Sequence, residues 1–253
     1  MKIVVSPAKS LDLESPLPIQ EHSEPQFLME AQKINRILAK KKPKALSQLM
    51  QISDGLAQLN WERNQNFNLP FTPKNARPAI FAFNGDVYQG LDAYSLTAKE
   101  LEVLQQRLRI LSGLYGMLKP LDLIQPYRLE MGTTLNIGRK KNLYEFWKDT
   151  LTAQLNQELK ADELFVNLAS QEYFGAIDKK KLKVPVITPV FKDWKNDKLK
   201  VISFYAKKAR GTMVRYIVQQ GVDSLDGLRM FDRDGYEFSQ EHTVKEHEPV
   251  FIR

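Results

Sequence analysis

The sequence predicts a mixed α/β fold, an α+β arrangement in which helices flank a mixed sheet, and three observations predict it. Short apolar runs alternate with amphipathic segments along the 253 residues. Several of these runs are joined by short turns, which favours a mixed sheet over a purely parallel one. No internal repeat or linker divides the chain, so we expect one domain over residues 1–253.

The first third of the chain is expected to give one strand and three helices. Lys2–Val5 is a short apolar run that ends at a Ser-Pro turn signal, which is typical of a buried strand. Apolar residues then recur at helical spacing until Pro43, which ends or resets the helix. The expected elements are a strand at 2–5 and helices at about 26–41, 43–50 and 53–64.

The middle third contains the clearest helix start in the sequence. Thr97 and Glu100 have the spacing of a capping box, in which both side chains satisfy free amides of the first helical turn. The elements expected here are a strand at 78–84, a helix from 97 to about 106, a strand at 108–112 and an irregular stretch at 113–131.

The last third is expected to contain two long helices. Ser170 has the position of a helix cap, and Gly221 that of a helix stop. Two prolines between Val184 and Phe191 indicate an edge strand or a bulge. The expected elements are a helix at 142–160, a strand at 164–168, a short helix after Ser170, an extended segment at 184–191, a strand at 200–205 and a helix at 206–219.

The composition excludes several classes of function. The chain has no Cys and only three His, so thiolate catalysis, disulfides and Cys-based zinc sites are excluded, and we expect no metal site and no cofactor. His242 and His247 lie five residues apart, the wrong spacing for one face of a helix. No apolar run is long enough for a signal peptide or a membrane span, so we expect a cytoplasmic protein without a membrane partner.

The positive charge is concentrated in one segment. The formal charge is +7, and twelve of the 37 basic residues lie between Lys179 and Arg215, where only Asp193 and Asp197 oppose them. The rest of the chain holds 25 basic and 28 acidic residues, so this segment alone makes the protein basic. A polyanionic partner would explain the charge, and a solvated, solubilising face would explain it equally well.

Residues 49–57, between the helices expected within 43–64, have apolar spacing that resembles a helix-hairpin-helix DNA-binding element. In that element a tight turn between two helices presents backbone amides to a phosphate. Gln51 and Ser53 stand where the element normally has glycine, which permits positive φ and close backbone approach. An ordinary helical hairpin also fits. Ser53 and Lys44 are the candidate phosphate contacts, with further lysines at 40–42.

A second basic segment runs from Ile202 to Tyr216. Aromatic residues alternate in it with cations, as suits a surface that contacts both phosphates and bases. We expect a strand running into a helix, with three cations in or near the first turn and a fourth further along, and at least one of Phe204 and Tyr205 in the core. The candidate phosphate contacts are Lys207, Lys208, Arg210 and Arg215.

A third group of polar residues follows the strands, where α/β folds build their clefts. Lys9 and Arg128 could bind phosphate, and Glu130 could act as a base or orient them. Turn residues with incidental polar neighbours would give the same pattern. If the group is catalytic, Lys9, Ser112, Tyr115 and Glu130, with Arg128, should converge in one cleft.

Five segments together are similar to the YaaA family of bacterial peroxide stress proteins, in order and spacing and over essentially the whole chain. These segments are Ser6–Asp12, Leu111–Asp122, Pro126–Met131, Asn167–Ser170 and Ile202–Gly211. The resemblance implies an unusual α/β fold, a protein that limits peroxide damage by lowering available iron, and binding of double-stranded DNA through a basic cleft and a helix-hairpin-helix element. It implies no established reaction.

The resemblance also implies which residues bind DNA. Residues 43–64 align with the family's helical hairpin, and six cations match its basic positions: Lys9, Arg128, Lys207, Lys208, Arg210 and Arg215. The departures are Met117, where an aliphatic residue also occurs, and Lys119, where an arginine also occurs. Lysine keeps the charge but loses the fork that grips a phosphate at two points.

Two hypotheses of function follow. The first is a monomeric protein that holds double-stranded DNA by its backbone with little sequence specificity, and whose effect on iron is indirect because no iron-binding cluster can be assembled from the sequence. The alternative is an enzyme that acts on a nucleotide or a nucleic-acid phosphate in the same cleft. A third class, a structural adaptor, would have neither a cleft nor affinity for anions.

Overall fold

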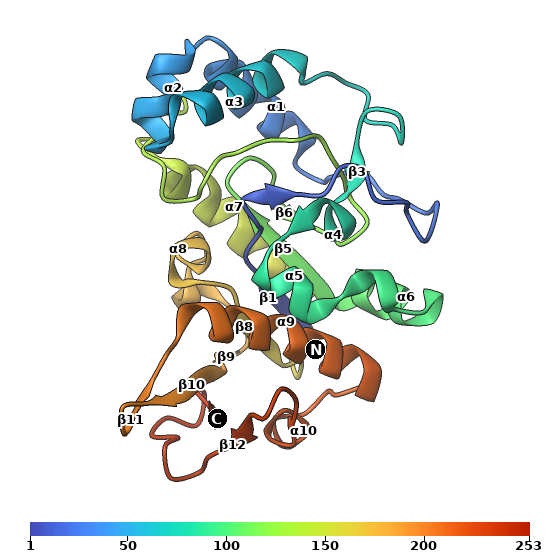
Figure 1. The fold of residues 1–253 in the computed structure, drawn as a ribbon, viewed down its shortest axis with the longest axis vertical. Helices are drawn as coiled ribbons and strands as arrows, with labels where there is room; N and C mark the ends of the chain where they lie inside the picture. The colour runs from blue at the N-terminus through green and yellow to red at the C-terminus, as the bar shows by residue number, and fades with distance from the viewer.

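The computed structural model describes all residues, 1–253, and its centre is a five-stranded sheet in the order β6-β5-β1-β8-β9 (Figure 1). Every neighbouring pair is parallel except β5 and β6, so the predicted mixed α+β fold is confirmed. The strands are β1 (Lys2–Val5), β5 (Leu108–Ser112), β6 (Gly116–Leu118), β8 (Phe165–Leu168) and β9 (Val186–Ile187).

The second sheet has the order β11-β10-β13-β12 and packs on a cluster of Phe and Tyr rings. Its strands are β10 (Val190–Lys195), β11 (Lys198–Lys200), β12 (Glu237–Phe238) and β13 (Val250–Ile252). The buried Asp193 ties the chain end to this sheet, because it accepts hydrogen bonds from Tyr236 Oη at 2.8 Å and Arg253 Nε at 2.9 Å. Two smaller ladders pair β2 (Ser10–Leu11) with β4 (Phe83–Asn84) and β3 (Arg77–Pro78) with β7 (Leu123–Ile124).

Helices surround both sheets. In Figure 1, α1 to α3 form the upper end of the molecule, and α9 crosses between the central sheet and the second sheet. The helices are α1 (Leu28–Ala39), α2 (Pro43–Met50), α3 (Asp54–Asn66), α4 (Ala79–Ala82), α5 (Asp86–Leu91), α6 (Ala98–Arg107), α7 (Leu143–Glu158), α8 (Gln171–Phe174), α9 (Ser203–Gln220) and α10 (Leu225–Arg229), with 3₁₀ turns η1 (Ala93–Ser95) and η2 (Lys179–Lys181).

Local signals placed several of these ends correctly. The capping box at Thr97 and Glu100 is present, Ser170 caps α8, and Gly221 ends α9 in the left-handed conformation. β9 is an edge strand, as its prolines indicated. These ends were predictable because each depends on a side chain and an amide only a few residues apart.

Three predicted elements were wrong. Residues 78–84 are not one strand but a helical turn, α4, between two short strands, because a continuously buried apolar run does not distinguish helix from strand. The irregular stretch 113–131 contains β6 and β7. The strand at 200–205 was also wrong: β11 ends at Lys200 and α9 begins at Ser203, which leaves Phe204 and Tyr205 exposed rather than in the core.

Two glycines allow α5 and α9 to touch backbone to backbone. A Cβ atom on Gly211 of α9 would collide with the carbonyl of Val87, and one on Gly90 of α5 would collide with the carbonyl of Lys208. Neither glycine has positive φ, so the requirement is for space and not for conformation. This contact fixes how α9 lies against α5.

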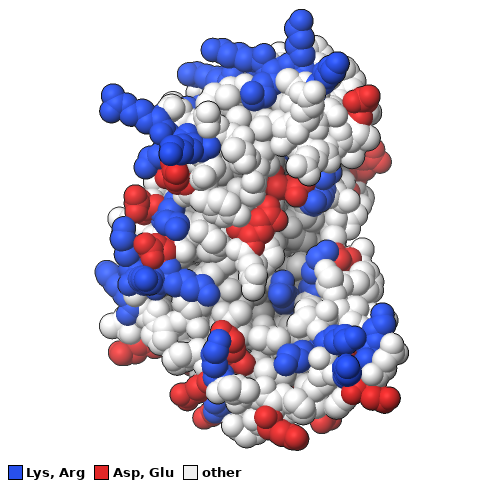
Figure 2. All heavy atoms as spheres, turned by 90° about the vertical axis from the view of Figure 1, so that its left-hand side faces the viewer, with Lys and Arg blue, Asp and Glu red and all other residues white.

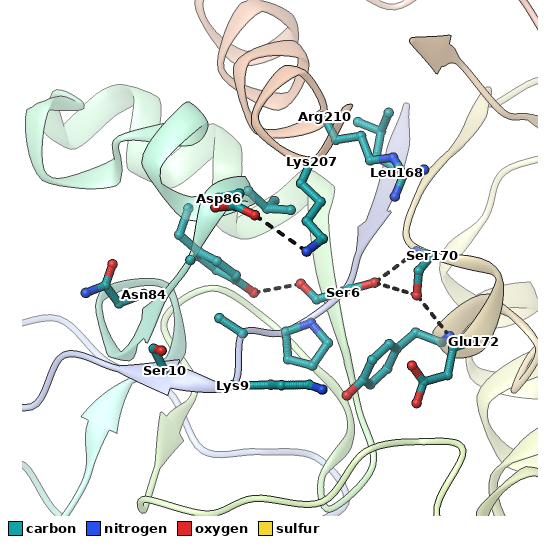
Figure 3. Close-up of a pocket in the computed structure, with 16 residues that line it drawn as sticks. Ser6, Lys9, Ser10, Asn84, Asp86, Leu168, Ser170, Glu172, Lys207 and Arg210 are labelled. Atoms are coloured by element: carbon teal, nitrogen blue, oxygen red, sulfur yellow. Dashed lines mark hydrogen bonds and ion pairs between the residues drawn. The ribbon is translucent and has the colours of Figure 1, made fainter. Parts of the chain in front are cut away.

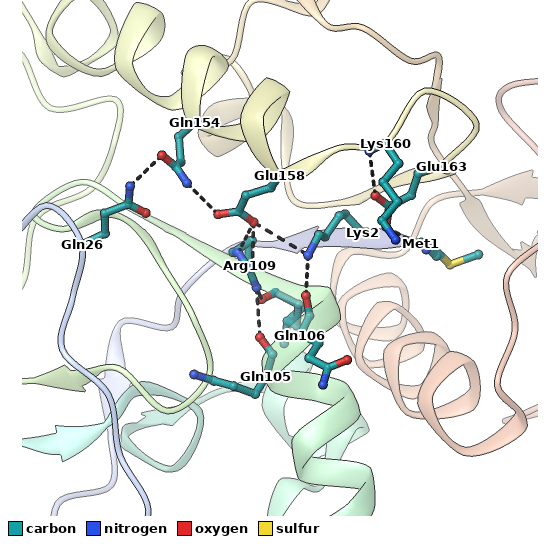
Figure 4. Close-up of polar contacts among 11 residues, drawn as sticks. Met1, Lys2, Gln26, Gln105, Gln106, Arg109, Gln154, Glu158, Lys160 and Glu163 are labelled. Atoms are coloured by element: carbon teal, nitrogen blue, oxygen red, sulfur yellow. Dashed lines mark hydrogen bonds and ion pairs between the residues drawn. The ribbon is translucent and has the colours of Figure 1, made fainter.

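At the amino ends of the central strands, buried charges are paired (Figure 4). Arg109, on β5, donates from both Nε and Nη2 to Glu158 of α7, at 2.7 and 2.6 Å. Burial alone would raise the pKa of Glu158, but a hydrogen bond from Gln154 and the charges of Arg109 and Lys2 hold that pKa below its usual value. Nearby, the N-terminal ammonium pairs with Glu163 at 2.9 Å.

We expect Gly211→Ala to lower the free energy of unfolding by about 3 kcal/mol, because the added methyl group must push two helices apart. Helix propensity alone predicts the opposite sign, since alanine is favoured over glycine by about 1 kcal/mol. Urea unfolding would measure the change. The control is Gly55→Ala in α3, where a Cβ meets nothing within 4 Å and stability should stay equal or rise. Equal effects of the two substitutions would contradict this account of the contact.

We expect Glu158→Gln to lower the free energy of unfolding by about 3 kcal/mol at pH 7, because it leaves Arg109 buried without a counter-charge. The folded-state pKa of Glu158 is lowered, so the wild type keeps this stability above the unfolded pKa and loses it as the pH falls through the folded pKa. The difference between the variants should therefore shrink below about pH 4.3. A constant difference in urea titrations from pH 7 to pH 3 would rule out the linkage.

Candidate functional site

The candidate site lies at the carboxyl ends of β1 and β8, which are neighbours in the central sheet. The chain leaves β1 through Ser6–Ser10 and leaves β8 through Ser170, and both segments line one pocket. β1 lies between β5 on one side and β8 on the other, so connections run to opposite sides of it. Crevices at such points are where open α/β sheets bind ligands.

This pocket, which we call the α9 pocket, has a volume of about 460 Å³ and is lined by 16 residues (Figure 3). Its walls come from four parts of the chain: the loop after β1, the start of α5, the β8–α8 junction and one face of α9. The charged side chains that line it are Lys9, Asp86, Glu172, Lys207 and Arg210.

Hydrogen bonds among Ser6, Ser170 and Tyr88 hold the floor of the pocket. Ser6 Oγ accepts from the Ser170 amide at 2.9 Å, and the two hydroxyl oxygens lie 3.3 Å apart. Tyr88 donates from its hydroxyl to the Ser6 carbonyl at 3.0 Å, and burial raises the pKa of Tyr88 far above its usual value, so it remains a donor. The end of β1 is thus joined to both α5 and α8.

Two cations of α9 point into this pocket. Figure 3 shows Lys207 reaching from α9 toward Ser6, with Arg210 beside it near Leu168. Lys207 Nζ lies 3.5 Å from a carboxylate oxygen of Asp86. Arg210 has no hydrogen-bond or ion-pair partner, and burial lowers its pKa. A partly buried guanidinium without an acceptor is an unsatisfied site for an anion.

A second hollow, the hairpin-side groove, has a volume of about 520 Å³ and shares Glu172 with the pocket. It lies between residues 48–51 of the helical hairpin and the segment around Glu130. Glu130 pairs with Lys9 at 2.8 Å and with Arg128 at 3.1 Å. The structure therefore brings together three of the residues singled out from the sequence.

Arg63 of α3 is close enough to Arg128 for the two like charges to interact. Burial and the charge of Arg128 both lower the pKa of Arg63. Arg128 Nε is buried and has no hydrogen-bond partner. Glu130 compensates part of this repulsion through its ion pair with Arg128. Arg63 was missed from the sequence, where it is one polar residue of an exposed-looking helix.

The helical hairpin consists of α2 and α3, which pack together across a three-residue turn. Gln51 takes the left-handed conformation, φ 52°, although it is not glycine, and buried Ile52 anchors the turn. Ser53 is extended and caps α3 through a hydrogen bond from the Leu56 amide. The backbone conformation at position 53 therefore does not require glycine. Lys44 is exposed on α2.

Ser112 and Tyr115 do not converge on the cleft. Both are completely buried, and Ser112 Oγ bonds with Tyr127 Oη at 2.7 Å while Tyr115 Oη accepts from the Gln125 amide at 3.0 Å. The interpretation of these two residues as catalytic partners of Lys9 and Glu130 was therefore wrong. Their polar atoms satisfy one another inside the core beneath the site.

Three of the other candidate cations lie elsewhere on the molecule or serve the fold. Lys119 is at the amino end of the central sheet, beside Arg109 and Glu158 and at the opposite edge from Lys9. Arg215 donates to the carbonyls of Leu91 and Asp92 and so ties α9 to the end of α5. Lys208 is exposed on α9 but does not line the pocket.

The face that contains both hollows carries both signs of charge. Figure 2 shows Lys and Arg side chains gathered at the hairpin end and on both sides of the lower half, with Asp and Glu between them around a hollowed centre. Glu130 and Glu172 line the hollows, and Glu172 accepts a hydrogen bond from the Gly132 amide at 3.0 Å. Cations and carboxylates therefore line the same hollows, with Lys9, Lys207 and Arg210 in the pocket.

No helix of the structure has both the length and the apolar character needed to cross a bilayer. No three His, Asp or Glu side chains are grouped so that they could hold a metal ion.

Comparison with known proteins gives one consistent result. Residues 1–242 match the family model described as peroxide stress protein YaaA. The chain is 62% identical over 238 residues to a UPF0246 protein of Flavobacterium johnsoniae, covering 94% of each chain. It is 63% identical to one of Flavobacterium psychrophilum with the same coverage, and 52% identical over 255 residues to one of Alteromonas mediterranea, covering 100% of this chain and 98% of the relative. This chain belongs to the YaaA family of peroxide stress proteins.

Proposed function

We propose that this protein acts in the peroxide stress response as a cytoplasmic monomer that binds double-stranded DNA along the two hollows. The observation that carries the proposal is the set of three cations that line the pocket: Lys9 from the loop after β1, and Lys207 and Arg210 from α9. Arg128, which pairs with Glu130, and the hairpin residues Arg63 and Lys44 are proposed to extend this set along the path of the DNA. Cations from separate elements facing one groove are what a phosphate backbone requires.

The unsatisfied guanidiniums support the same proposal. Arg128 Nε has no acceptor, and Arg210 has no counter-ion. Arg210 is partly buried and has no protein partner, whereas the outer nitrogen of Arg128 pairs with Glu130. A DNA phosphate at the rim of the pocket would give Arg210 an acceptor.

The proposed contacts are to the backbone, so binding is expected to show little sequence preference. The charge of Glu130 does not oppose DNA binding, because Lys9 and Arg128 already neutralise that carboxylate. Glu172 has no such partner and would repel a phosphate placed directly on it. The strand should therefore cross the hollow beside Glu172 and follow the cations at its rim.

Coverage of DNA would limit iron-dependent damage indirectly. The chain has no Cys, and no cluster of carboxylates and histidines is arranged for iron, so a direct storage role lacks ligands. A protein bound along the backbone would instead restrict access of oxidants and cations to the duplex.

One observation favours the enzyme alternative. Lys9 Nζ lies 2.8 Å from Glu130, and Lys9 is exposed in the same hollow as Lys207 and Arg210. An amine and a carboxylate in contact can exchange a proton, which general acid–base chemistry on a nucleotide phosphate would use. Ser112 and Tyr115 take no part in this version, because they are buried in the core.

We expect the triple variant Lys207→Ala/Lys208→Ala/Arg210→Ala to bind a 30-base-pair duplex at least about tenfold more weakly than the wild type, and the slope of log affinity against log salt to fall by about 2 to 3. Fluorescence anisotropy at 50 and 200 mM salt would measure both quantities.

The matched control for this experiment is Lys195→Ala/Lys198→Ala/Lys200→Ala on the β10–β11 ribbon. It removes the same net charge but none of its residues lines a hollow. Its affinity should fall by less than about threefold. A salt-independent affinity, or equal losses in the two triple variants, would reject the groove as the DNA site.

A further inference from the structure

We infer that the α9 pocket also binds a single nucleotide that carries a monophosphate. This inference shares Lys207 and Arg210 with the proposed duplex contacts, but it places its ligand inside the pocket rather than along the rim. Arg210 and Lys207 are the groups that would hold the phosphate. Figure 3 shows both side chains entering the pocket from α9, one turn of helix apart at most. Arg210 has no ionic partner, and its pKa is lowered by burial, so a bound anion would relieve an existing cost.

The hydroxyl groups of Ser6, after β1, and Ser170, after β8, complete the phosphate end of the site. Ser6 Oγ and Ser170 Oγ lie 3.3 Å apart on the pocket floor, and Figure 3 shows Lys207 directed toward Ser6. A phosphate beside them could accept from both hydroxyls and from the two cations. Such a set of short-range donors around one small volume differs from the spaced cations that follow a DNA backbone.

The size of the pocket sets the size of its ligand. A volume of about 460 Å³ is within the range of about 300–1,000 Å³ that is typical of small-molecule sites. A single nucleotide fits this description, whereas a base-paired duplex cannot enter. Tyr88, Leu168 and Tyr173 give the pocket partly apolar walls, which a base or sugar can contact.

The acidic residues limit the number of phosphates. The charged groups that line the pocket are three cations and two anions, Asp86 and Glu172, so their sum is +1. Asp86 already pairs with Lys207 at 3.5 Å. A monophosphate is compatible with this balance, whereas the additional charges of a triphosphate would face these carboxylates without matching cations.

The same chemistry can come from two sources, a free mononucleotide or the 5′-phosphorylated terminal nucleotide of a strand. Both present one terminal phosphate on one unpaired nucleotide. The pocket shares Glu172 with the hairpin-side groove, so a strand end lying in that groove would be next to the pocket.

The first test is calorimetric titration of the whole protein with deoxyadenosine 5′-monophosphate, deoxyadenosine and inorganic phosphate. We expect the monophosphate to bind at least about tenfold more tightly than either part, because only it occupies both ends of the pocket. Equal affinity for inorganic phosphate would overturn the nucleotide site in favour of a simple anion site. No binding of the monophosphate at millimolar concentration would overturn the inference entirely.

Two variants test which residues bind the phosphate group of the nucleotide. Arg210→Gln and Lys207→Gln should each weaken the monophosphate about tenfold while leaving deoxyadenosine unchanged. Lys207 is half exposed, so its variant is available even if Arg210→Gln unfolds. The control is Arg233→Gln, which removes an equally exposed cation outside the pocket and should change nothing. Unchanged affinity in both Gln variants at 207 and 210 would contradict the assignment.

A competition experiment identifies the source. A ten-nucleotide single strand with a 5′-phosphate should displace the mononucleotide if strand ends are bound, and the same strand with a 5′-hydroxyl should not. Displacement by neither strand assigns the pocket to free mononucleotides, and equal displacement by both strands contradicts recognition of the terminal phosphate. Failure of duplex binding with retained mononucleotide binding would reject only the DNA proposal, and the reverse result would reject only this inference.

Discussion

The contact between α5 and α9 at Gly90 and Gly211 is the constraint on which the site depends. The two helices touch through backbone atoms, so their separation cannot vary with side-chain rotamers. α5 begins with Asp86 and α9 carries Lys207 and Arg210, and these three residues form one wall of the pocket. Tyr88 then joins α5 to the end of β1 through the Ser6 carbonyl. The cations are therefore positioned against the sheet by packing that involves no charge.

Charged side chains have different partners at the two ends of the central strands. At the amino ends of the strands, Arg109 is matched by Glu158 and the N-terminus by Glu163, so the charge serves stability. At the carboxyl ends, Lys9 and Arg128 pair with Glu130, and Lys207 pairs with Asp86. Arg210 has no ionic partner there. The proposed ligand would supply a counter-charge to Arg210.

The sequence predicted the parts of this arrangement that depend on interactions between residues close together in the chain. β1, β5, β8 and the capped helix starts follow from apolar runs and from side chains that bond to nearby amides. The cations of α9 and Lys9 were found because charge and motif spacing are visible in the chain. The sequence did not predict that they line one pocket. That arrangement depends on the order of the strands, which brings together segments more than 150 residues apart in the chain.

The failures have equally physical causes. Ser112 is the last residue of β5, whereas Ser6 lies just beyond β1. Ser112 pairs with Gly116 of the antiparallel strand β6 and is buried, so it does not reach the open end of the sheet. The same reversal puts Lys119 at the opposite edge of the sheet. Arg63 could not be found because only the packing of the hairpin on the body brings it near Arg128. Strand direction and tertiary packing, rather than local pattern, decided each case.

The chemistry of the site suits a protein that works while peroxide is present. Peroxide attacks thiolates and exposed thioethers, and the chain has no Cys. The groups proposed to hold phosphate are ammonium, guanidinium and hydroxyl groups, which peroxide does not oxidise readily. Of the methionines near the site, Met131 is fully buried, and only Met50 borders the hairpin-side groove. Oxidation there would alter one edge of the hairpin and leave the cations of the pocket intact, so binding through Lys207 and Arg210 would persist under the conditions in which the family acts.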